Sequence, residues 1–365
     1  QALLFEKQVT LLDHDFSVEE INQLLPAGTF PGKPLKQKLN SKIRDRDDLI
    51  SRLRNANDTN IGFFTSGTTG LPKGVDHKLQ TLARSVKISD DHQESVWAFA
   101  YNPTHIAGCQ VFLQAILNGN LLVNVFGASR HDILNGLSAH RCTHISATPT
   151  FYRMLLPAES VIESMKRVTF GGEKMDPLLA ERLTEIFPWA KFLNVYASTE
   201  AGTILAADGE VFSIKPEVVD LVKVEEEQLF VHSELLGTFG GGQAQDAEWY
   251  PTGDIVEIVS ADPLTFKIKH RVNDLINVGG YKVNPVEVEE VLSSYPGIKE
   301  ARVYGEKNSI MGNLVCCDIV RSDLAVTERS IRKHLAQELQ TFKIPRVINF
   351  IEALEKTRTG KLKRS

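Results

Sequence analysis

Short apolar runs recur along residues 61–205 and are separated by stretches of helical character. The clearest are VWAFAYN, NLLVNVF, THISATP, RVTFGGE and KFLNVYA. Strands that are apolar on both faces are typical of a parallel sheet that helices cover on both sides. The pattern therefore predicts an α/β domain built on mainly parallel sheets flanked by helices. Ahead of it, helices are expected at residues 17–25, which open with a capping-box pattern, and within 36–56.

The pattern changes after residue 205. The runs DGEVFSI, QLFVHSE, DIVEIVS and TFKIKHR have the character of hairpin strands, and polar turns are expected at residues 207–209 and 261–263. This part of the chain is predicted to be a β-rich subdomain of the same large N-terminal domain, which we place at residues 1–270.

A third pattern begins near residue 271. Asn284 and Pro285 are placed to cap a helix whose apolar residues recur at 288, 291, 292 and 295, the spacing of one helical face. Two strands, ARVYGE and NLVCCDIV, and a helix over residues 327–340 follow. Residues 271–365 are therefore predicted to form a small α+β domain.

Composition excludes several classes of protein. The 365 residues are 42% hydrophobic and 24% charged, and the net charge of -5 argues against a dedicated nucleic-acid binder. No apolar stretch reaches the roughly 20 residues of a membrane span. Residues 1–16 lack the pattern of a signal peptide. The four cysteines lack metal-ligand spacing, so we expect reduced thiols in a cytoplasmic protein.

The stretch TSGTTGLPKGV, residues 65–75, carries the first sign of chemistry. A strand that ends in a run of glycines and hydroxyl residues presents N–H and O–H donors, and Lys73 adds a positive charge, which together suit a polyphosphate. It is not a Walker A loop, because Lys73 follows Pro72 and precedes Gly74. A flexible surface loop is the alternative. The phosphate-binding candidates are Thr65, Ser66, Gly67, Thr68, Thr69, Gly70 and Lys73.

Five further blocks follow in order: VTFGGEKMDP (168–177), VYASTEAG (195–202), WYPTGD (249–254), HRVNDLINVGGYKVNPVEVEEVL (270–292) and KTRTGKLKR (356–364). With the threonine-rich stretch, they make the chain resemble the adenylate-forming superfamily of acyl- and aryl-CoA synthetases, luciferases and peptide-synthetase adenylation domains. The resemblance runs from about residue 61 to the last residue. It implies a large AMP-binding domain followed by a small mobile domain.

The resemblance also implies an activity and its cofactors. A carboxylic acid attacks the α-phosphorus of ATP in the presence of Mg²⁺, and the acyl-adenylate then forms a thioester, most simply with coenzyme A. By resemblance, Glu200 binds Mg²⁺, with a solvated glutamate at a helix start as the alternative interpretation. Expected nucleotide contacts are Thr199 at the α-phosphate, Gly172, Glu173 and Tyr196 at the adenine, and Asp254 and Arg271 at the ribose.

The C-terminal blocks imply a catalytic lysine and a hinge. Lys361 is expected to neutralise the carboxylate and the α-phosphate during adenylation, although the same tail reads otherwise as a plain basic segment. Asn273 stands at the expected pivot, where the family commonly has aspartate or lysine. Gly279 and Gly280 resemble the lining of a tunnel for the thiol arm, and a tight turn is compatible with this.

The substrate and the acceptor are less constrained. His105, in NPTHIAG, stands where CoA-forming members have a histidine at the substrate gate; a buried structural histidine is the alternative. The expected acyl pocket comprises His105, Gly171, Ala197 and Ser198. Ala197 replaces the usual glycine, which favours a compact or flat acid. Small aryl or short-chain acids are thus expected.

Two other functions stay open. The acyl group could pass to a free-standing carrier protein or to an amine, or the chain could be a non-catalytic nucleotide-binding relic. Only about 60 residues precede the phosphate loop, fewer than is usual in the family, and a homodimer would cover the exposed sheet.

Overall fold

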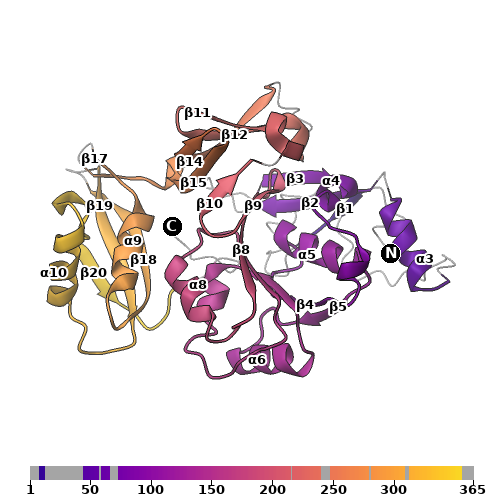
Figure 1. Ribbon diagram of the computed structural model, residues 1–365. Coiled ribbons are helices and arrows are strands. Elements are labelled where there is room, and N and C mark those ends of the chain that lie inside the picture. The colour runs from indigo at the N-terminus through magenta and orange to yellow at the C-terminus, as the bar shows by residue number, and fades with distance from the viewer. Residues whose placement is uncertain are drawn as a thin grey trace, which may run out of the picture. The chain divides into compact units, whose positions relative to one another are not determined.

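The computed structural model describes residues 8–12, 44–56, 59–65, 73–214, 216–239, 247–278, 281–308 and 312–355. The chain divides into two compact units (Figure 1). The first comprises Gln1–Lys223, Phe230–Tyr250 and Ser260–Thr265, and the second comprises Val224–Leu229, Pro251–Val259 and Phe266–Ser365. The predicted domain boundary between residues 270 and 271 stays a prediction, and the helix expected at 17–25 lies outside the described residues.

The first unit contains a six-stranded sheet. Its order is β5 (Leu121–Asn124), β4 (Val96–Phe99), β6 (His144–Ala147), β7 (Arg167–Gly171), β8 (Lys191–Ser198) and β9 (Gly202–Ala207). The first five strands pair in parallel, as the apolar runs predict. The edge strand β9 is antiparallel to β8. The two are therefore joined by a short hairpin loop instead of a helical crossover.

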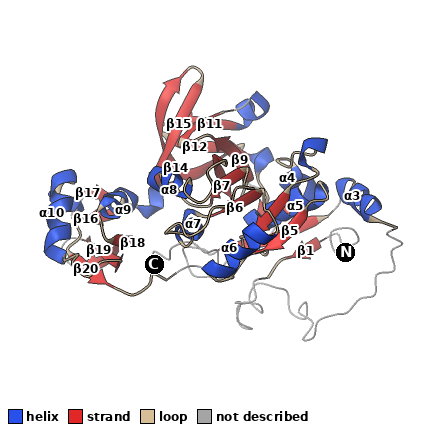
Figure 2. Ribbon diagram, turned by 60° about the horizontal axis from the view of Figure 1, so that its bottom comes forward, coloured by secondary structure: helices blue, strands red, loops and turns tan. Residues whose placement is uncertain are grey.

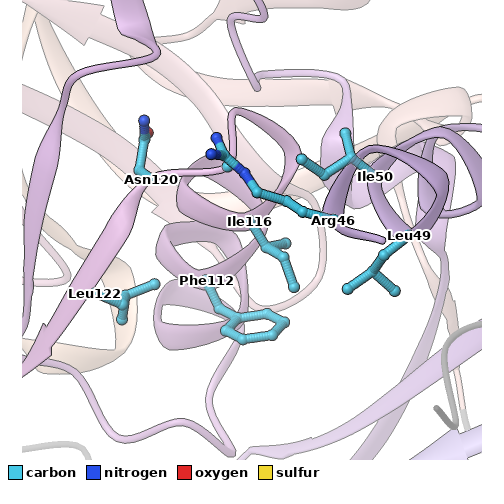
Figure 3. Close-up of a pocket in the computed structure, with 8 residues that line it drawn as sticks. Arg46, Leu49, Ile50, Phe112, Ile116, Asn120 and Leu122 are labelled. Atoms are coloured by element: carbon cyan, nitrogen blue, oxygen red, sulfur yellow. The ribbon is translucent and has the colours of Figure 1, made fainter. Parts of the chain in front are cut away.

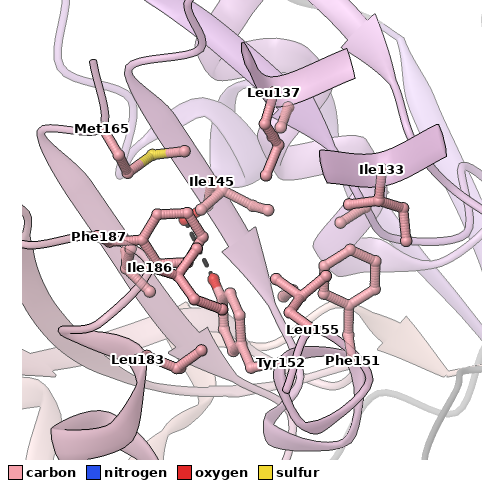
Figure 4. Close-up of a cluster of buried hydrophobic side chains, with 14 of the residues drawn as sticks. Ile133, Leu137, Ile145, Phe151, Tyr152, Leu155, Met165, Leu183, Ile186 and Phe187 are labelled. Carbon is pink, nitrogen blue, oxygen red and sulfur yellow. Dashed lines mark hydrogen bonds between the residues drawn. The ribbon is translucent and has the colours of Figure 1, made fainter. Parts of the chain in front are cut away.

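Helices cover both faces of this sheet. On one face α6 (Arg130–Ala139), α7 (Pro149–Arg153) and α8 (Pro177–Leu183) bury a large apolar cluster against the strands (Figure 4). Within it the hydroxyl of Tyr152 donates to the carbonyls of Ile145, at 3.3 Å, and Thr169, at 2.9 Å, so this buried polar group is satisfied. On the other face α5 (Ile106–Leu117) packs through Val111 against Phe99.

Helix α5 also covers a second sheet of the first unit (Figure 1). This sheet has the order β1 (Gln8–Thr10), β2 (Asn60–Thr65), β3 (Lys73–Lys78) and β13 (Thr238–Phe239). Leucines and isoleucines of α3 (Arg46–Arg54), α4 (Leu79–Ala83) and α5 pack on Ile61 and Phe63 of β2. The single turn η1 (Asp90–His92) precedes β4.

The sequence predicts a helix in the segment 36–56. Helix α3 occupies the C-terminal part of this segment.

The β-rich region forms a five-stranded sheet of order β10 (Val211–Ser213), β15 (Leu264–Arg271), β14 (Trp249–Ala261), β12 (Gln228–His232) and β11 (Val222–Glu225). All four runs predicted as hairpin strands after residue 205 are strands here, which confirms that prediction. The 3-10 turn η2 (Pro216–Leu221) connects β10 to β11, and η3 (Ser233–Leu235) connects β12 to β13 of the four-stranded sheet.

The second unit contains the predicted α+β segment, visible in both views (Figures 1 and 2). Its sheet has the order β17 (Tyr281–Val283), β16 (Ile276–Val278), β19 (Gly312–Arg321) and β18 (Ile298–Asn308), and β20 (Val347–Phe350) pairs in parallel with β19. Helices α9 (Pro285–Ser294) and α10 (Glu328–Glu338) pack on it. Asn284 caps α9 through its side chain, as predicted. Short turns η4 (Val272–Asp274) and η5 (Thr341–Lys343) complete the unit.

All four cysteines are free and buried, in agreement with the expected reduced thiols. Among the described helices, none has the length and hydropathy needed to cross a bilayer.

Candidate functional site

Residues predicted for the site gather where the parallel strands of the six-stranded sheet end. His105 follows β4, Gly171 to Glu173 lie at the end of β7, and Tyr196 to Glu200 lie at the end of β8. Tyr101 and Thr150, neither of them a predicted site residue, follow β4 and β6. Ligands of open parallel sheets bind outside these carboxyl ends. Blocks that lie up to about a hundred residues apart in the sequence therefore share one edge of the first unit.

The Gly171–Glu173 turn is held by two side chains. The hydroxyl of Tyr101 donates to the Gly171 carbonyl at 3.2 Å, and burial raises the pKa of this phenol. The Glu173 carboxylate accepts from the backbone N–H of Thr150, at 3.1 Å, and from its hydroxyl, at 2.8 Å. Glu173 thus joins the end of β7 to the start of α7. The adenine contacts expected of Gly172 and Glu173 stay predictions.

Thr199 and Glu200 lie in the loop of the β8–β9 hairpin. Ser198 pairs with Gly202, so three residues form the loop, and Gly202 takes a φ of +66°. A glycine with positive φ after a three-residue loop is a frequent hairpin geometry. The Ser198 hydroxyl accepts from the N–H of Ala201 at 3.2 Å, which stiffens the turn. The alternative that placed Glu200 at a helix start is wrong.

Tyr196 and Ala197 precede this loop. The strand register shifts between them, which marks a bulge in β8. The Tyr196 ring is buried and meets Phe212 edge-on at 6.4 Å between centroids. Ala197 and Ser198 are half-buried at the end of the strand. Adenine stacking on Tyr196 and the acyl-pocket role of Gly171, Ala197 and Ser198 stay predictions.

The predicted phosphate loop is bracketed by paired strands. Thr65, the last residue of β2, pairs with Lys73, the first residue of β3, in an antiparallel register. This confirms the strand that the sequence places before the loop. Ser66, Gly67, Thr68, Thr69 and Gly70 lie outside the described residues, as do the side chains of Thr65 and Lys73.

His105 is the N-cap residue of α5 and lies in the segment that follows β4. Its carbonyl accepts from Cys109 N at 2.9 Å, and its own N–H donates to the Asn102 carbonyl at 3.1 Å. The Asn102 side chain accepts from the N–H of Thr104 at 3.0 Å, which makes the chain turn sharply before the helix. This places half-buried His105 at the same edge as the other strand ends. Its role at the substrate gate stays a prediction.

In the second unit, Asp254 and Arg271 form an ion pair. The guanidinium Nε of Arg271 lies 2.9 Å from Oδ1 of Asp254, whose side chain is only 6% exposed. The N–H of Asp254 donates to the Thr252 hydroxyl at 3.1 Å, which fixes its main chain. The structure thus brings together the two residues that the resemblance assigns to the ribose; the ribose contact itself stays a prediction.

The remaining C-terminal candidates are described only in part. Asn273 lies in the η4 turn, and its side chain lies outside the described residues, together with Gly279, Gly280 and Lys361. Val278 pairs with Tyr281 across the two glycines, as the tight-turn alternative predicts for the residues that flank them.

Comparison with known proteins assigns the family. Residues 7–222 match the sequence model of the AMP-binding enzymes, and residues 287–361 match that of the AMP-binding enzyme C-terminal domain. The chain belongs to the AMP-binding enzyme family. This confirms the resemblance to the adenylate-forming superfamily.

Among curated members of this AMP-binding family, the chain is 28% identical over 329 residues to the 2-succinylbenzoate–CoA ligase of Staphylococcus epidermidis, which covers 82% of this chain and 68% of that enzyme. It is 27% identical over 349 residues to the enzyme of the same name from Staphylococcus aureus, covering 87% of this chain and 68% of that enzyme. The chain therefore spans about two thirds of the length of these relatives.

Solved AMP-binding enzymes share the fold. The o-succinylbenzoate CoA synthetase from Bacillus subtilis, solved with an acyl-adenylate intermediate, superposes with a TM-score of 0.66 at 23% identity, covering 83% of this chain and 67% of that one. ATP-bound MatB from Rhodopseudomonas palustris gives a TM-score of 0.68 at 21% identity, covering 83% and 66%. These matches confirm the predicted mixed α/β fold.

One carboxylate in the hairpin loop fits a magnesium ion that is bound mainly by phosphate and water. Among the described residues, no group of three or more His, Cys, Asp or Glu side chains is arranged to hold a metal. Mg²⁺ with a nucleotide needs only one or two protein carboxylates. Glu200 is half-buried, and no hydrogen bond or ion pair joins its side chain to another described residue.

Two residues that contact the hairpin loop were not predicted from the sequence. His77 of β3 contacts the Thr199 carbonyl at 2.7 Å, and Arg84, just after α4, donates to the Ala201 carbonyl. No local motif marks either residue, since their partners lie more than a hundred positions away.

A surface cavity of about 260 Å³ lies apart from these residues (Figure 3). Its walls come from α3, α5 and the start of β5, and the apolar side chains of Leu49, Ile50, Phe112 and Ile116 line it together with Arg46. None of the predicted site residues lines it.

Proposed function

We propose that this AMP-binding enzyme is an ATP-dependent acid–CoA ligase that forms an acyl-adenylate and then a thioester. The observation that carries the proposal is the β8–β9 loop. Its main chain is fixed at the carboxyl edge of the sheet, while Thr199 and Glu200 keep half-exposed side chains. Curated relatives over most of the chain are ligases of this kind.

The first step joins the acid to AMP. A carboxylate oxygen bonds to the α-phosphorus of ATP and the bond to pyrophosphate breaks, so negative charge builds up on the phosphate and must be met by positioned donors and cations. The Thr199 hydroxyl donates to the α-phosphate, Glu200 holds Mg²⁺, and Lys361 neutralises the reacting anions. Mg²⁺ held by Glu200 would supply charge neutralisation at the phosphates. In the second step the thiolate of CoA bonds to the acyl carbon and AMP leaves.

A compact aromatic acid is the substrate class that we propose. The curated relatives are named for 2-succinylbenzoate, an aromatic acid. In this chain the Tyr101 hydroxyl would lie 3.0 Å from a Cβ on Gly171, which supports little space beside Gly171 in the expected pocket. The methyl of Ala197 would narrow the expected pocket further.

Transfer to a carrier protein or an amine is the second candidate. An amide bond synthetase from Marinactinospora thermotolerans shares the fold at 20% identity with a TM-score of 0.67, so the fold alone is compatible with either acceptor. A cytoplasmic location and a homodimer stay predictions.

Exchange of labelled pyrophosphate into ATP tests the proposal. Wild-type protein should catalyse exchange with at least one acid from a panel of 2-succinylbenzoate, benzoate and short aliphatic acids, and should not do so without acid. CoA and then a purified carrier protein are added to the active combination, and the acylated thiol is identified by mass spectrometry. Absence of exchange with every acid would contradict a ligase and favour the non-catalytic alternative.

A further inference from the structure

The hairpin loop is held through its backbone carbonyls. Within Thr199–Thr203, four carbonyls accept hydrogen bonds from groups outside the hairpin. The donors are His77 to Thr199, the N–H of Gly237 to Glu200 at 2.8 Å, and Arg84 to Ala201 and Thr203. These donors belong to β3, to the residue preceding β13 and to the end of α4. The loop is thus attached to the four-stranded sheet.

His77 is a neutral donor in this arrangement. A carbonyl only accepts hydrogen bonds, so Nε2 of His77, 2.7 Å from the Thr199 oxygen, must carry the hydrogen. The ring is 1% exposed, and burial, together with the nearby Arg84 cation, lowers the pKa of the imidazole, although the hydrogen bond to Thr199 and the Glu200 and Asp76 carboxylates act in the opposite sense. Burial thus favours the neutral imidazole with its hydrogen on Nε2.

Arg84 spans two segments with one planar group. Nη1 donates to the Leu235 carbonyl at 3.2 Å, and Nη2 donates to the carbonyls of Ala201 and Thr203, the latter at 3.4 Å. The guanidinium presents several donors in a fixed fork, which a lysine ammonium does not reproduce. Arg84 therefore keeps the loop and the 235–237 segment at a set separation.

Gly237 is wedged between the loop and β3. A Cβ at this position would lie 2.6 Å from Cγ1 of Val75, 2.8 Å from the Asp76 oxygen and 2.8 Å from the His77 ring. Directly after it, Thr238 and Phe239 pair with Asp76 and Val75. The backbone there is in direct contact with the strand that starts at Lys73.

We propose that His77 and Arg84 are positioning residues for the adenylation step. They fix the main chain that carries Thr199 and Glu200 relative to β3, the strand that follows the predicted phosphate loop. Thr199 and Glu200 then keep a fixed position relative to β3 while ATP binds. Misplacement by about 1 Å costs on the order of a hundredfold in rate. This inference rests on the proposed function.

Paired variants of His77 test it. His77→Gln keeps an amide N–H near the Nε2 position, whereas His77→Asn is one bond too short and His77→Leu has no donor. We expect His77→Leu and His77→Asn to lower acid-dependent pyrophosphate exchange about 10- to 100-fold and to raise the Mg²⁺ concentration for half-maximal activity. His77→Gln should recover most of the activity. Exposed His140→Leu is the matched control.

Arg84 is tested in the same way. Arg84→Lys keeps the charge but loses the fork, so its exchange activity should fall between those of wild type and Arg84→Met. Exposed Arg182→Met controls for removal of a cation. Each variant is also given synthetic acyl-adenylate at saturation with CoA. Thioester formation should stay within about threefold of wild type, because that step needs no metal carboxylate.

The outcomes separate the two proposals. Exchange and thioester formation that fall in parallel with the folded fraction, or that both stay at the wild-type level, would overturn the positioning role and leave the ligase function standing. If the wild-type protein catalysed no pyrophosphate exchange with any acid of the panel, both proposals would be overturned. Because His77→Asn and Arg84→Lys keep polar side chains, a folding failure of the apolar variants does not decide the matter.

Discussion

Thr199 and Glu200 are held by their backbone carbonyls and not by their side chains. Their carbonyls bond to His77 and Gly237, while their side chains are half-exposed. Asp254 is the opposite case, since its carboxylate already has a cation in Arg271. The resemblance identified Asp254, Arg271, Thr199 and Glu200 as candidates. It could not identify His77 or Arg84, because their role depends on contacts with backbone atoms of distant residues, which side-chain identity does not encode.

Glu200→Gln tests the metal carboxylate. Removing the negative charge should raise the Mg²⁺ concentration for half-maximal pyrophosphate exchange and lower the maximal rate by roughly tenfold or more, equivalent to ~1.4 kcal/mol or more. Glu181→Gln, at an exposed position of α8, is the comparison and should leave the metal dependence unchanged. An unaltered Mg²⁺ titration in Glu200→Gln would remove this residue from the metal site.

His144 makes stability depend on pH. Burial, with the cations Arg167 and Lys166 nearby, lowers the pKa of its imidazole to about 4, from 6.5 when unfolded. The folded state then binds fewer protons between these values, so the contribution is present above pH 6.5 and is lost as pH falls towards 4. It amounts to at most about 3 kcal/mol. Urea unfolding from pH 7 to 5 should show a smaller loss of stability in His144→Gln than in wild type. An equal loss in both proteins would contradict this assignment, and exposed His140→Gln is the control.

At the scale of elements, the β8–β9 hairpin carries the loop with Thr199 and Glu200. The parallel strands could be predicted because their runs are apolar on both faces. The reversal of β9 could not, because its residues GTILAA have the same local character as a parallel strand. Direction is set by the three-residue loop and by Gly202, whose backbone conformation only the structure reveals. The β-rich strands and α9 were predictable from alternation and from the Asn284 cap.

Gly202→Ala should strain this hairpin. An L-residue at a φ of +66° costs about 1–2 kcal/mol, and the new Cβ would lie 3.1 Å from Nε2 of Gln110. We expect a lower free energy of unfolding and also reduced pyrophosphate exchange per folded molecule. Gly209→Ala has a similarly positive φ in an open turn, so it should lose stability alone. Equal specific activity in the two variants would argue against a catalytic role for the loop geometry.

At the scale of the whole molecule, each unit contributes a different part of the predicted chemistry. The first unit supplies the hairpin loop and the strands that flank the phosphate loop. The second supplies the Asp254–Arg271 pair and the chain that leads to Lys361. The two-domain organisation could be expected from the change of pattern along the sequence. The pairing of β20 with β19 could not be predicted, because β20 is a four-residue strand without a distinctive pattern.

Lys361→Ala should separate the two half-reactions. Pyrophosphate exchange should fall by at least about a hundredfold, because a positioned cation is lost from a step that builds up negative charge. Thioester formation from supplied acyl-adenylate should be retained. Lys363→Ala, two residues further along, should affect neither step. Equal losses of both activities in Lys361→Ala would rule out a lysine that serves adenylation alone.

The position of the parallel strand β20 limits how far Lys361 can lie from its own unit. Ile351 N bonds to the Ile319 carbonyl at 3.0 Å, so the chain is held to its own unit as far as residue 351. Lys361 lies ten residues after Ile351, so its Cα can lie at most about 35 Å from the Cα of Ile351. Inserting or removing residues between Ile351 and Lys361 would therefore change how far the side-chain amine of Lys361 can reach. Such a change alters no residue that is expected to touch a substrate.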